Sequence, residues 1–248
     1  MSWIDGAVLG FDTETTGVDV ATDRVVTAAL VRRTPTGTVV RRWLLDPGVP
    51  IPQGATAIHG VTTEQARAQG RAPRAALDEI ADELATALLR DEPVVAFNAS
   101  FDLSLLDAEL RRHRLPTLPE RIARDVRVVI DPLVLDRHLD RFRPGKRRLG
   151  DLCAHYGVPT DTLHAADADV MATLGVLAAL GRSFPVLGSM DADEVHDRQV
   201  GAHRLWAESF NAWRTTQGLA GPGAELGWPS RRPAEEHAEE HSTVAVPA

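Results

Sequence analysis

The chain has 248 residues, of which 44% are hydrophobic and 25% are charged, a composition typical of a globular protein with a sizeable core. Its formal net charge of −8 excludes a protein that coats nucleic acid through a broad basic surface, because that mode of binding depends on many phosphate contacts. A single cysteine, Cys153, excludes an internal disulfide framework and a zinc site built from several cysteines. The longest uncharged apolar stretch, residues 170–180, is too short to span a membrane, so we expect a cytoplasmic protein without membrane contact.

The first predicted element is an apolar run, residues 7–11, that ends in two acids, Asp12 and Glu14. The run fits a buried central strand, in which residues i and i+2 point to the same face, so the two carboxylates would lie side by side. Carboxylates held this close repel each other unless a cation lies between them, and a divalent cation with oxygen ligands meets that need. Asp107 and Glu109 have the same spacing in a helical pattern, where positions two apart diverge by roughly 200°, so they would chelate poorly.

Two β-branched runs, residues 25–31 and 39–45, follow the first strand and are joined by turn residues at 34–37. They predict an antiparallel meander, and a loop comes after it. An amphipathic helix is then predicted from apolar residues at positions i, i+3, i+7 and i+11, namely Leu77, Ile80, Leu84 and Leu88.

The middle of the chain continues the alternation of strands and helices. Strands are predicted at residues 93–98 and 126–130, and Asp131 is expected to cap the helix that follows the second of them. Further helices are predicted at residues 101–114, 149–156 and 166–180. This alternation predicts an α/β fold with one sheet formed by residues 7–130.

The character of the chain changes past residue 185. A helix is predicted at residues 191–217, and an aromatic row on one of its faces, Trp206, Phe210 and Trp213, must cover the core or bind a partner. From Gly218 onward Gly, Pro, Glu and His dominate, which is typical of a disordered tail. We therefore expect three parts: a domain at 1–185, a helical extension at 186–217 and a disordered tail at 218–248.

Asp102 follows the second buried strand, at its junction with the next helix. Ligands of open α/β sheets commonly bind at such strand ends, so this carboxylate is a candidate partner for the acids of the first strand. The alternative is an acid in the first turn of a helix that is favoured by the helix dipole.

His164 lies near two acids, Asp167 and Asp169, at the start of the last helix of the core. A histidine beside carboxylates that hold metal suits a general base, because its ordinary pKa lies near working pH. It could equally cap the helix or lie on the surface. Asp167 and Asp169 both compete for a metal-binding role, and periodicity alone does not choose between them.

Taken together, these motifs resemble the three exonuclease motifs of the DEDDh family. The matching segments are residues 11–17, residues 98–102 and His164 with Asp169, in this order. The family includes the epsilon proofreading subunit of bacterial DNA polymerase III, RNase T and oligoribonuclease. Within the matched region, residues 58–62 are similar to the His-Gly-Ile-Thr loop of the family, and residues 149–158 to its helix before the third motif.

The resemblance implies a ribonuclease H-like fold, in which a mixed sheet is flanked by helices. It also implies two divalent cations, Mg²⁺ or Mn²⁺, and a general base, His164. The implied metal ligands are Asp12, Glu14, Asp102 and Asp169. The family spacing of five between histidine and acid favours Asp169 over Asp167.

The implied reaction is removal of nucleoside 5′-monophosphates, one at a time, from the 3′ end of a single-stranded or 3′-terminal nucleic acid. Two metal ions can activate water and stabilise both the phosphoryl oxygens and the departing oxygen, which this hydrolysis requires. By resemblance, Thr15, Thr16 and His59 would contact the terminal nucleotide. Phe101 would either stack on a base or belong to the core. A basic cluster would either follow the phosphate backbone or form a solvated loop: Arg141, Arg143, Lys146, Arg147 and Arg148.

Three functions are compatible with these residues. The first is a 3′-to-5′ exonuclease acting on DNA in proofreading or repair, which the continuation of the chain past the matched core favours. The second is an RNA exonuclease of the RNase T or oligoribonuclease type. The third is an inactive module that binds a protein partner through Trp206, Phe210 and Trp213, although buried carboxylates are costly to keep without a metal.

Overall fold

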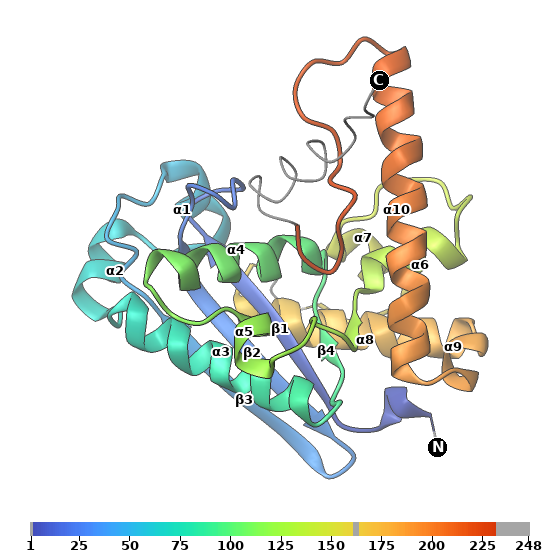
Figure 1. The fold of residues 1–248 in the computed structure, drawn as a ribbon, viewed down its shortest axis with the longest axis horizontal. Coiled ribbons are helices and arrows are strands. Elements are labelled where there is room, and N and C mark those ends of the chain that lie inside the picture. The colour runs from blue at the N-terminus through green and yellow to red at the C-terminus, as the bar shows by residue number, and fades with distance from the viewer. Residues whose placement is uncertain (1, 161–163, 232–248) are drawn as a thin grey trace, which may run out of the picture.

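The computed structural model describes residues 2–160 and 164–231, and Figure 1 shows a twisted sheet with helices packed around it. The sheet has five strands in the order β3-β2-β1-β4-β5. Their bounds are Val8–Thr15 (β1), Val25–Thr34 (β2), Gly37–Leu44 (β3), Val94–Val95 (β4) and Val129–Ile130 (β5). The first three strands are antiparallel neighbours, whereas β1, β4 and β5 run parallel. The predicted α/β class, with a mixed sheet flanked by helices, is confirmed.

Ten α-helices and one short 3₁₀ turn, Trp3–Asp5, surround the sheet in the part of the chain that the structure describes. The helices are Gln53–His59 (α1), Thr63–Gln69 (α2), Pro73–Leu89 (α3), Ala99–Arg112 (α4), Leu118–Ile122 (α5), Pro132–Leu139 (α6), Leu149–Tyr156 (α7), Ala166–Ser183 (α8), Val186–Ser189 (α9) and Ala192–Thr216 (α10). Within residues 2–160 and 164–231, no helix is both long and apolar enough to cross a membrane.

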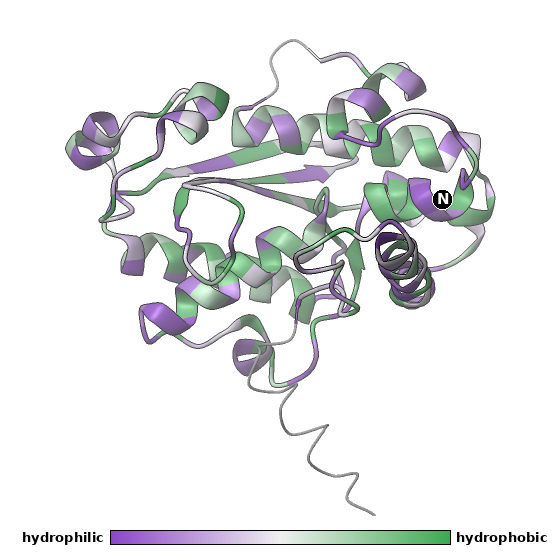
Figure 2. Ribbon diagram, turned by 90° about the horizontal axis from the view of Figure 1, so that it is seen from above, coloured by the Kyte–Doolittle hydropathy of each residue, from purple (hydrophilic) through white to green (hydrophobic). Residues whose placement is uncertain are grey.

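Helices cover both faces of the sheet, as the view from above in Figure 2 shows. On one face, Leu9 and Phe11 of β1 belong to a core that includes the apolar side of α3 and α4. On the other face, Val8 belongs to a second core with Val170 and other residues of α8. Since successive residues of a strand point to opposite faces, β1 joins the two cores.

The close contact between β1 and α8 depends on Gly10. A Cβ atom at Gly10 would lie 2.3 Å from Cγ1 of Val170, closer than real side chains approach, and 3.3 Å from Cδ1 of Leu174, which is a tight contact. The missing side chain therefore allows α8 to pack directly against the backbone of β1. This contact determines where the first turn of α8 lies relative to the end of β1.

Three predicted elements differ from those observed. The strand predicted at residues 93–98 is only Val94–Val95, because the chain turns at Asn98, whose φ is 60°. The strand predicted at residues 126–130 is only Val129–Ile130, and it follows Val128, whose φ is 59°. The segment after β3, predicted as a loop, contains the two short helices α1 and α2.

The segment after α10 folds back onto the molecule as far as residue 231 (Figure 1). The Trp228 side chain is buried against the ring of His196, with the ring centroids 5.1 Å apart. The N–H of Arg231 donates to the hydroxyl of Ser104 at 2.7 Å. Residues 218–231 thus differ from the disordered tail expected there, because a buried tryptophan and a hydrogen bond attach them to the core. The rest of that predicted tail, 232–248, lies outside the described residues.

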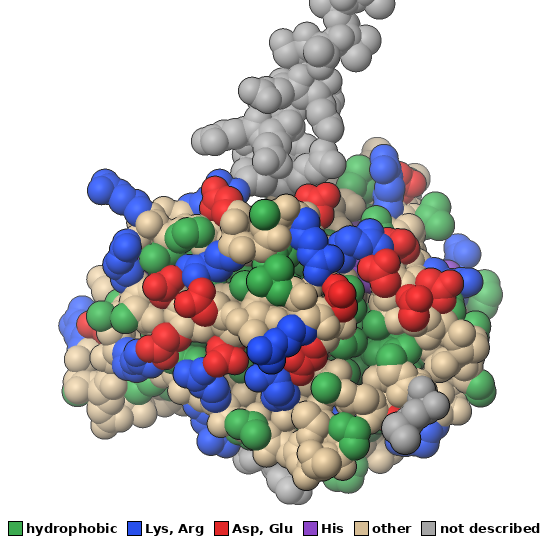
Figure 3. Space-filling view, turned by 60° about the horizontal axis from the view of Figure 1, so that its bottom comes forward, with side chains coloured by type: hydrophobic (Ala, Val, Ile, Leu, Met, Phe, Trp, Pro, Cys, Tyr) green, Lys and Arg blue, Asp and Glu red, His purple; other side chains and the backbone are tan. Residues whose placement is uncertain are grey.

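Charges of both signs are mixed on the face of the molecule shown in Figure 3. No continuous basic patch is visible on this face of the described residues. Ion pairs join opposite charges among the described residues: Arg32 and Glu92 lie 2.9 Å apart, and Arg127 and Asp193 lie 2.8 Å apart.

Candidate active site

Three carboxylates meet at the carboxyl end of β1. Asp12 and Glu14 project from the same face of the strand, and Asp169 comes from the first turn of α8. One carboxylate oxygen from each of the three lies within 4.8 Å of the others. Asp169 directly precedes Val170, so the packing of Val170 on Gly10 brings its carboxylate to the strand end.

Asp102 reaches the same place from the opposite face of the sheet. Its Oδ1 accepts hydrogen bonds from the N–H and the hydroxyl of Thr13, at 3.0 and 2.6 Å. Thr13 lies between Asp12 and Glu14 in the strand, so its side chain points to the other layer, where α4 begins. Asp102 is 3% exposed, and its charge raises the pKa of Asp12, although it is not among the three acids whose oxygens converge.

The environment opposes ionisation of these acids in the absence of a cation. Burial raises the pKa of Asp12 well above its ordinary value, and the charges of Asp102, Glu14 and Asp169 raise it further. Burial, followed by the charge of Asp169, raises the pKa of Glu14 to about 7. Burial also raises the pKa of Asp102 to about 7, against the lowering effect of its hydrogen bonds from Thr13.

The donor set at this site fits a hard divalent cation. All three converging ligand atoms are carboxylate oxygens, which suit Mg²⁺ and Mn²⁺ better than softer metals. Burial and the neighbouring carboxylates raise the pKa of Asp12 and of Glu14 because both disfavour a negative charge. The positive charge of a bound cation would favour the ionised carboxylates instead. Residues from β1 and α8 could therefore hold metal, with Asp102 adjacent.

His164 lies beside the acids, but its backbone rather than its ring makes the observed contact. Its N–H donates to Oδ1 of Asp169 at 3.1 Å, and its side chain is exposed. The φ of His164 is 80°, in the left-handed region. Residues 161–163, which precede it, lie outside the described part of the chain. The backbone of His164 thus holds Asp169, while its imidazole is exposed to solvent.

Asp167 points elsewhere. Its carboxylate pairs with the guanidinium of Arg42 on β3, and this contact lowers the pKa of Asp167. Of the two acids that the sequence left in competition, only Asp169 lies in the converging group.

Asp107 and Glu109, the pair with the same spacing, face different partners. Glu109 is 1% exposed and pairs with Arg112 and Arg24. Asp107 lies 3.5 Å from the N–H of Leu118, which donates to it. The two carboxylates diverge because they lie on a helix, as expected from its geometry.

The threonines expected to contact the terminal nucleotide both make hydrogen bonds within the protein. The hydroxyl of Thr16 donates to Asp23 at 2.7 Å and accepts from the N–H of Arg24 at 3.0 Å, so this side chain holds the turn after β1. The hydroxyl of Thr15 donates to the carbonyl of Gly17 at 2.6 Å.

His59 and Phe101 lie on α1 and α4. Nδ1 of His59 accepts from the N–H of Val61 at 3.2 Å, whereas its buried Nε2 has no hydrogen-bond partner among the described residues. Burial lowers the pKa of His59, which favours the neutral form of its ring. Phe101 is partly buried and packs against the core on its side of the sheet, which is the structural role considered for it.

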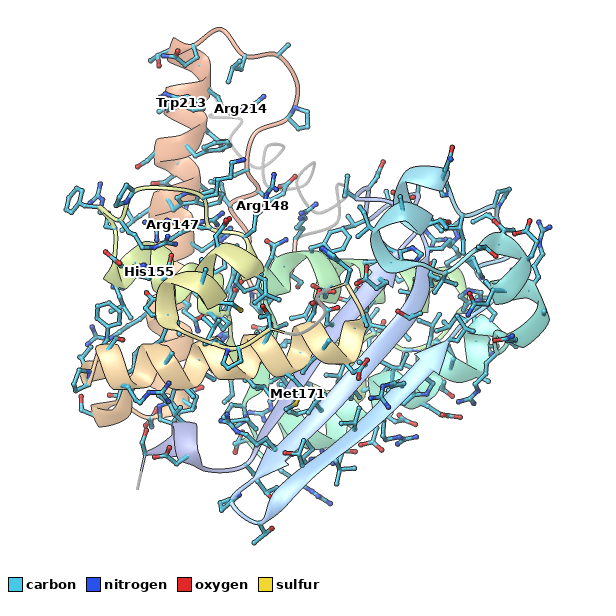
Figure 4. The ribbon with its side chains drawn as sticks, turned by 180° about the vertical axis from the view of Figure 1, so that it is seen from behind. Arg147, Arg148, His155, Met171, Trp213 and Arg214 are labelled. Atoms are coloured by element: carbon cyan, nitrogen blue, oxygen red, sulfur yellow. The ribbon has the colours of Figure 1, made fainter. Side chains whose placement is uncertain are left out.

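Two of the five residues of the basic cluster before α7 are engaged within the protein. Arg143 and Arg147 both pair with Asp136, which is fully buried and also accepts from the hydroxyl of Tyr156 at 2.8 Å. Arg147 donates in addition to four backbone carbonyls, those of Asp136, Asp140, Arg141 and Arg143. Figure 4 shows Arg147 and Arg148 on the segment that leads into α7. The exposed members of the cluster are Arg141, Lys146 and Arg148.

Part of the aromatic row of α10 also makes contacts within the protein. Trp206 stacks on Phe210, with the ring centroids 5.4 Å apart, and the guanidinium of Arg137 lies 3.8 Å from the Trp206 centroid. Trp213 is 51% exposed and lies near the far end of α10, away from the sheet (Figure 4).

The sequence alone did not indicate how three residues shape the site: Thr13, Gly10 and Asp131. Asp131 caps α6 as predicted, but its carboxylate also accepts from the N–H groups of Asn98 and Ala99, both at 3.0 Å. The period of two in a strand could have identified Thr13, since the residue between two inward acids must face the other layer. For Asp131 the sequence held no further signal, because its partners lie more than 30 residues away.

A family model places the chain among known proteins. The model of the RNase T family, described as exonuclease, matches residues 9–177, which is more than half of the chain. The matched range includes β1, α4 and the first turns of α8, the elements that carry the four acids.

Curated relatives cover the same region. A DNA polymerase III PolC-type protein of Streptococcus thermophilus is 32% identical over 166 residues, covering 66% of this chain and 10% of that protein. The corresponding protein of Streptococcus suis is 30% identical over 173 residues, covering 68% of this chain and 11% of that protein. The chain thus spans about a tenth of the length of these relatives.

Solved structures share the fold. A structure of Exonuclease I has a TM-score of 0.63 at 22% identity, covering 80% of this chain and 44% of that one. The E. coli Exonuclease I complex with a dT13 oligonucleotide has a TM-score of 0.59 at 21% identity, covering 72% and 41%. A complex of Exonuclease I with SSB-Ct has a TM-score of 0.62 at 21% identity, covering 81% and 44%.

Proposed function

The chain belongs to the RNase T exonuclease family, within the DEDD group of 3′-to-5′ exonucleases, and from this premise we propose that it hydrolyses nucleic acid from the 3′ end in a metal-dependent reaction. Its products would be nucleoside 5′-monophosphates. The observation that carries the proposal is the convergence of Asp12, Glu14 and Asp169 at the end of β1, with Asp102 beside them.

The acids have the role of metal ligands in this proposal. Asp12, Glu14, Asp102 and Asp169 would hold two divalent cations, Mg²⁺ or Mn²⁺. When bound, such cations supply an activated water and neutralise charge on the phosphoryl oxygens. Thr13 holds Asp102 in place, and the backbone of His164 holds Asp169.

His164 is the proposed general base. Its ring is exposed beside Asp169, where it can take a proton from the attacking water and pass it to solvent. His59 and Thr15 are the proposed contacts of the terminal nucleotide, and the unpartnered Nε2 of His59 supports its part in this. Thr16 and Phe101 would shape the site around the terminal nucleotide, because a hydrogen bond holds Thr16 and core packing holds Phe101.

DNA is the favoured substrate. The matched relatives are named as DNA polymerase III PolC-type proteins, and one structural neighbour is a complex of Exonuclease I with a DNA oligonucleotide. An RNA exonuclease of the RNase T or oligoribonuclease type is the second candidate, because the family includes both. An inactive partner-binding module is disfavoured by four acids that stay clustered although burial opposes their charge.

A protein partner would meet α10 at Trp213. The Trp206 end of the aromatic row is covered by Arg137, which leaves Trp213 as its most exposed ring. A structural neighbour, Exonuclease I, is known in complex with SSB-Ct, which supports a partnered enzyme as the model for this chain. The cytoplasmic location expected from the single cysteine stays a prediction.

The decisive experiment supplies 5′-labelled single-stranded DNA and RNA of several lengths to the full chain, with Mg²⁺, with Mn²⁺ and with chelator. We expect a ladder that shortens from the 3′ end, a higher rate on DNA, and no cleavage with chelator. Asp12→Asn should reduce the rate to that of the chelated wild type, because one converging ligand charge is lost.

Asp107→Asn is the matched control, since this residue begins the other Asp-x-Glu pair and lies outside the site. Its rate should equal that of the wild type. Full activity of Asp12→Asn, or cleavage that persists with chelator, would overturn the metal-dependent mechanism. A higher rate on RNA would select the second candidate.

A further inference from the structure

The outer edge of the sheet, at β5, is covered by α10 in an unusual way. In the parallel ladder, the carbonyls of Val128 and Ile130 bond to β4, so the N–H of Asp131 and the carbonyl of Val129 point away from β4. Gln199 of α10 satisfies both groups. Its Oε1 accepts from the N–H of Asp131 at 2.7 Å, and its Nε2 donates to the carbonyl of Val129 at 3.0 Å.

The side chain of Gln199 therefore substitutes for the next strand. It is 1% exposed, so its Oε1 depends on the N–H of Asp131, while its Nε2 also donates to the carbonyl of Val195 at 3.3 Å. His196, one turn earlier, adds a contact between its Nδ1 and the N–H of Val129 at 3.3 Å. Gln199 of α10 thus fixes the position of Asp131, the residue after β5, although it lies 68 residues further along the chain.

Asp131 transmits that position to α4. Its two carboxylate oxygens accept from the N–H groups of Asn98 and Ala99, which begin α4, and from the N–H of Leu133 at 2.9 Å. Asn98, at the N-cap position of α4, makes no capping bond with its own side chain. Because the first N–H groups of a helix need acceptors, the start of α4 depends on Asp131.

Asp102 lies in the first turn of α4, one turn from these contacts. We propose that Gln199 is a positioning residue of the active site, which acts through Asp131 and the start of α4 to hold Asp102 against Thr13. This inference rests on the proposed function, because Asp102 is a metal ligand only there. It makes α10 a part of the site's framework.

The alternative is that Gln199 only stabilises the fold. The two roles differ in where the effect appears. A structural role lowers the free energy of unfolding and leaves the folded site unchanged, whereas a positioning role loosens the start of α4 and weakens metal binding in the folded protein. Partners outside the ligand shell commonly change metal affinity by about 10–100-fold.

The test replaces Gln199 in the full chain by methionine, which has a similar length and no hydrogen-bonding amide. Two readouts do not depend on catalysis: the affinity for Mn²⁺, from calorimetry or electron paramagnetic resonance, and the hydrogen exchange of the Asn98, Ala99 and Thr13 amides. We expect Gln199→Met to bind Mn²⁺ about 10–100-fold more weakly and to exchange these amides faster.

Val195→Ala is the control, because Val195 is fully buried one turn earlier in α10 and its side chain makes none of these hydrogen bonds. It should lower stability and leave both readouts at wild-type values. Asp131→Asn cuts the next link, since its amide nitrogen cannot accept from an N–H, and it should reproduce the signature of Gln199→Met. It also tests the proposal if the methionine variant does not fold.

Wild-type Mn²⁺ affinity and amide exchange in folded Gln199→Met, or in Asp131→Asn, would overturn the inference. Failure of the proposed function would look different. The wild-type chain would then cleave no nucleic acid, while the exchange of the Asn98 and Ala99 amides would still respond to Gln199→Met.

Discussion

At the scale of single residues, the role of each acid is decided by the groups that face it. Asp167 and Asp169 stand two positions apart in α8, yet one pairs with Arg42 and the other with the N–H of His164. Since an arginine partner satisfies a carboxylate and lowers its pKa, Asp167 has no need of a metal. Asp169 has a single N–H donor and two acids nearby, so we expect it to be the metal ligand of the two.

His164 offers a test of the base at this scale. We predict that His164→Asn lowers kcat by roughly 10²–10⁴-fold, because the proton acceptor is lost. Asparagine is chosen since it tolerates the left-handed backbone that His164 adopts. The affinity for Mn²⁺ should stay near that of the wild type, because the backbone N–H and not the ring contacts Asp169.

Alanine at the same position separates the two contributions of His164. His164→Ala removes the ring and also strains the backbone at a φ of 80°, so its metal affinity should fall below that of His164→Asn. Loss of Mn²⁺ binding in His164→Asn that equals its loss of rate would assign the ring to metal binding and contradict the role of general base.

At the scale of elements, the packing of α8 on β1 determines the geometry of the acids. The two elements meet at Gly10, two residues before Asp12, and at Val170, directly after Asp169. Close packing of this kind tolerates little added volume, so a small change in the core should displace the carboxylates of the site.

We predict that Gly10→Ala destabilises the protein by roughly 1–3 kcal/mol, because the new methyl group overlaps Val170. The displacement of α8 should also move Asp169 away from Asp12 and raise the Mg²⁺ concentration needed for half-maximal activity. Urea unfolding and a Mg²⁺ titration of the rate measure the two effects.

The double variant Gly10→Ala with Val170→Ala provides the control, since the smaller side chain makes room for the added methyl group. It should recover the Mg²⁺ requirement of the wild type even if it stays less stable than the wild type. An unchanged Mg²⁺ requirement in Gly10→Ala alone would show that the α8 contact does not position Asp169.

At the scale of the whole molecule, the cluster of acids at the end of β1 is expected to link stability to pH and to metal. Glu14 has its pKa raised from 4.5 to about 7 by burial and by Asp169, so the folded state binds more protons than the unfolded state between these values. The stability that the neutral carboxyl provides is therefore present below about pH 4.5 and is lost as the pH rises through about 7.

We predict that, with chelator, the wild type loses more stability than Glu14→Gln between pH 5 and pH 8, in urea unfolding at about one-unit pH steps. The comparison of variants is needed because three histidines, the half-buried His59 and the buried His196 and His203, have lowered pKa values and change stability in the opposite direction. Mg²⁺ should stabilise the wild type most at the upper end of this range, where the carboxylates are ionised.

Two outcomes would contradict this prediction. One is a pH profile of the wild type in chelator that is parallel to that of Glu14→Gln. The other is a stabilisation by Mg²⁺ that is equal at every pH, which would mean that the cation does not bind the acids whose pKa values are raised.

The sequence by itself determined the class of the fold and the side-by-side placement of Asp12 and Glu14. Both follow from local rules: alternation along a strand is a property of the backbone, and the order of strands and helices leaves few ways to form a layered core. The same rules explain why Asp107 and Glu109 diverge on their helix.

Only the tertiary structure decided which distant groups meet. It paired Arg42 with Asp167 across 125 residues, Thr13 with Asp102 across 89, and Gln199 with Asp131 across 68. It also turned Arg143 and Arg147 inward to Asp136, although their sequence reads as a basic surface cluster. The physical reason is that a hydrogen bond or ion pair depends on the spatial arrangement of groups that have no fixed spacing in the chain, so local pattern carries no signal for it.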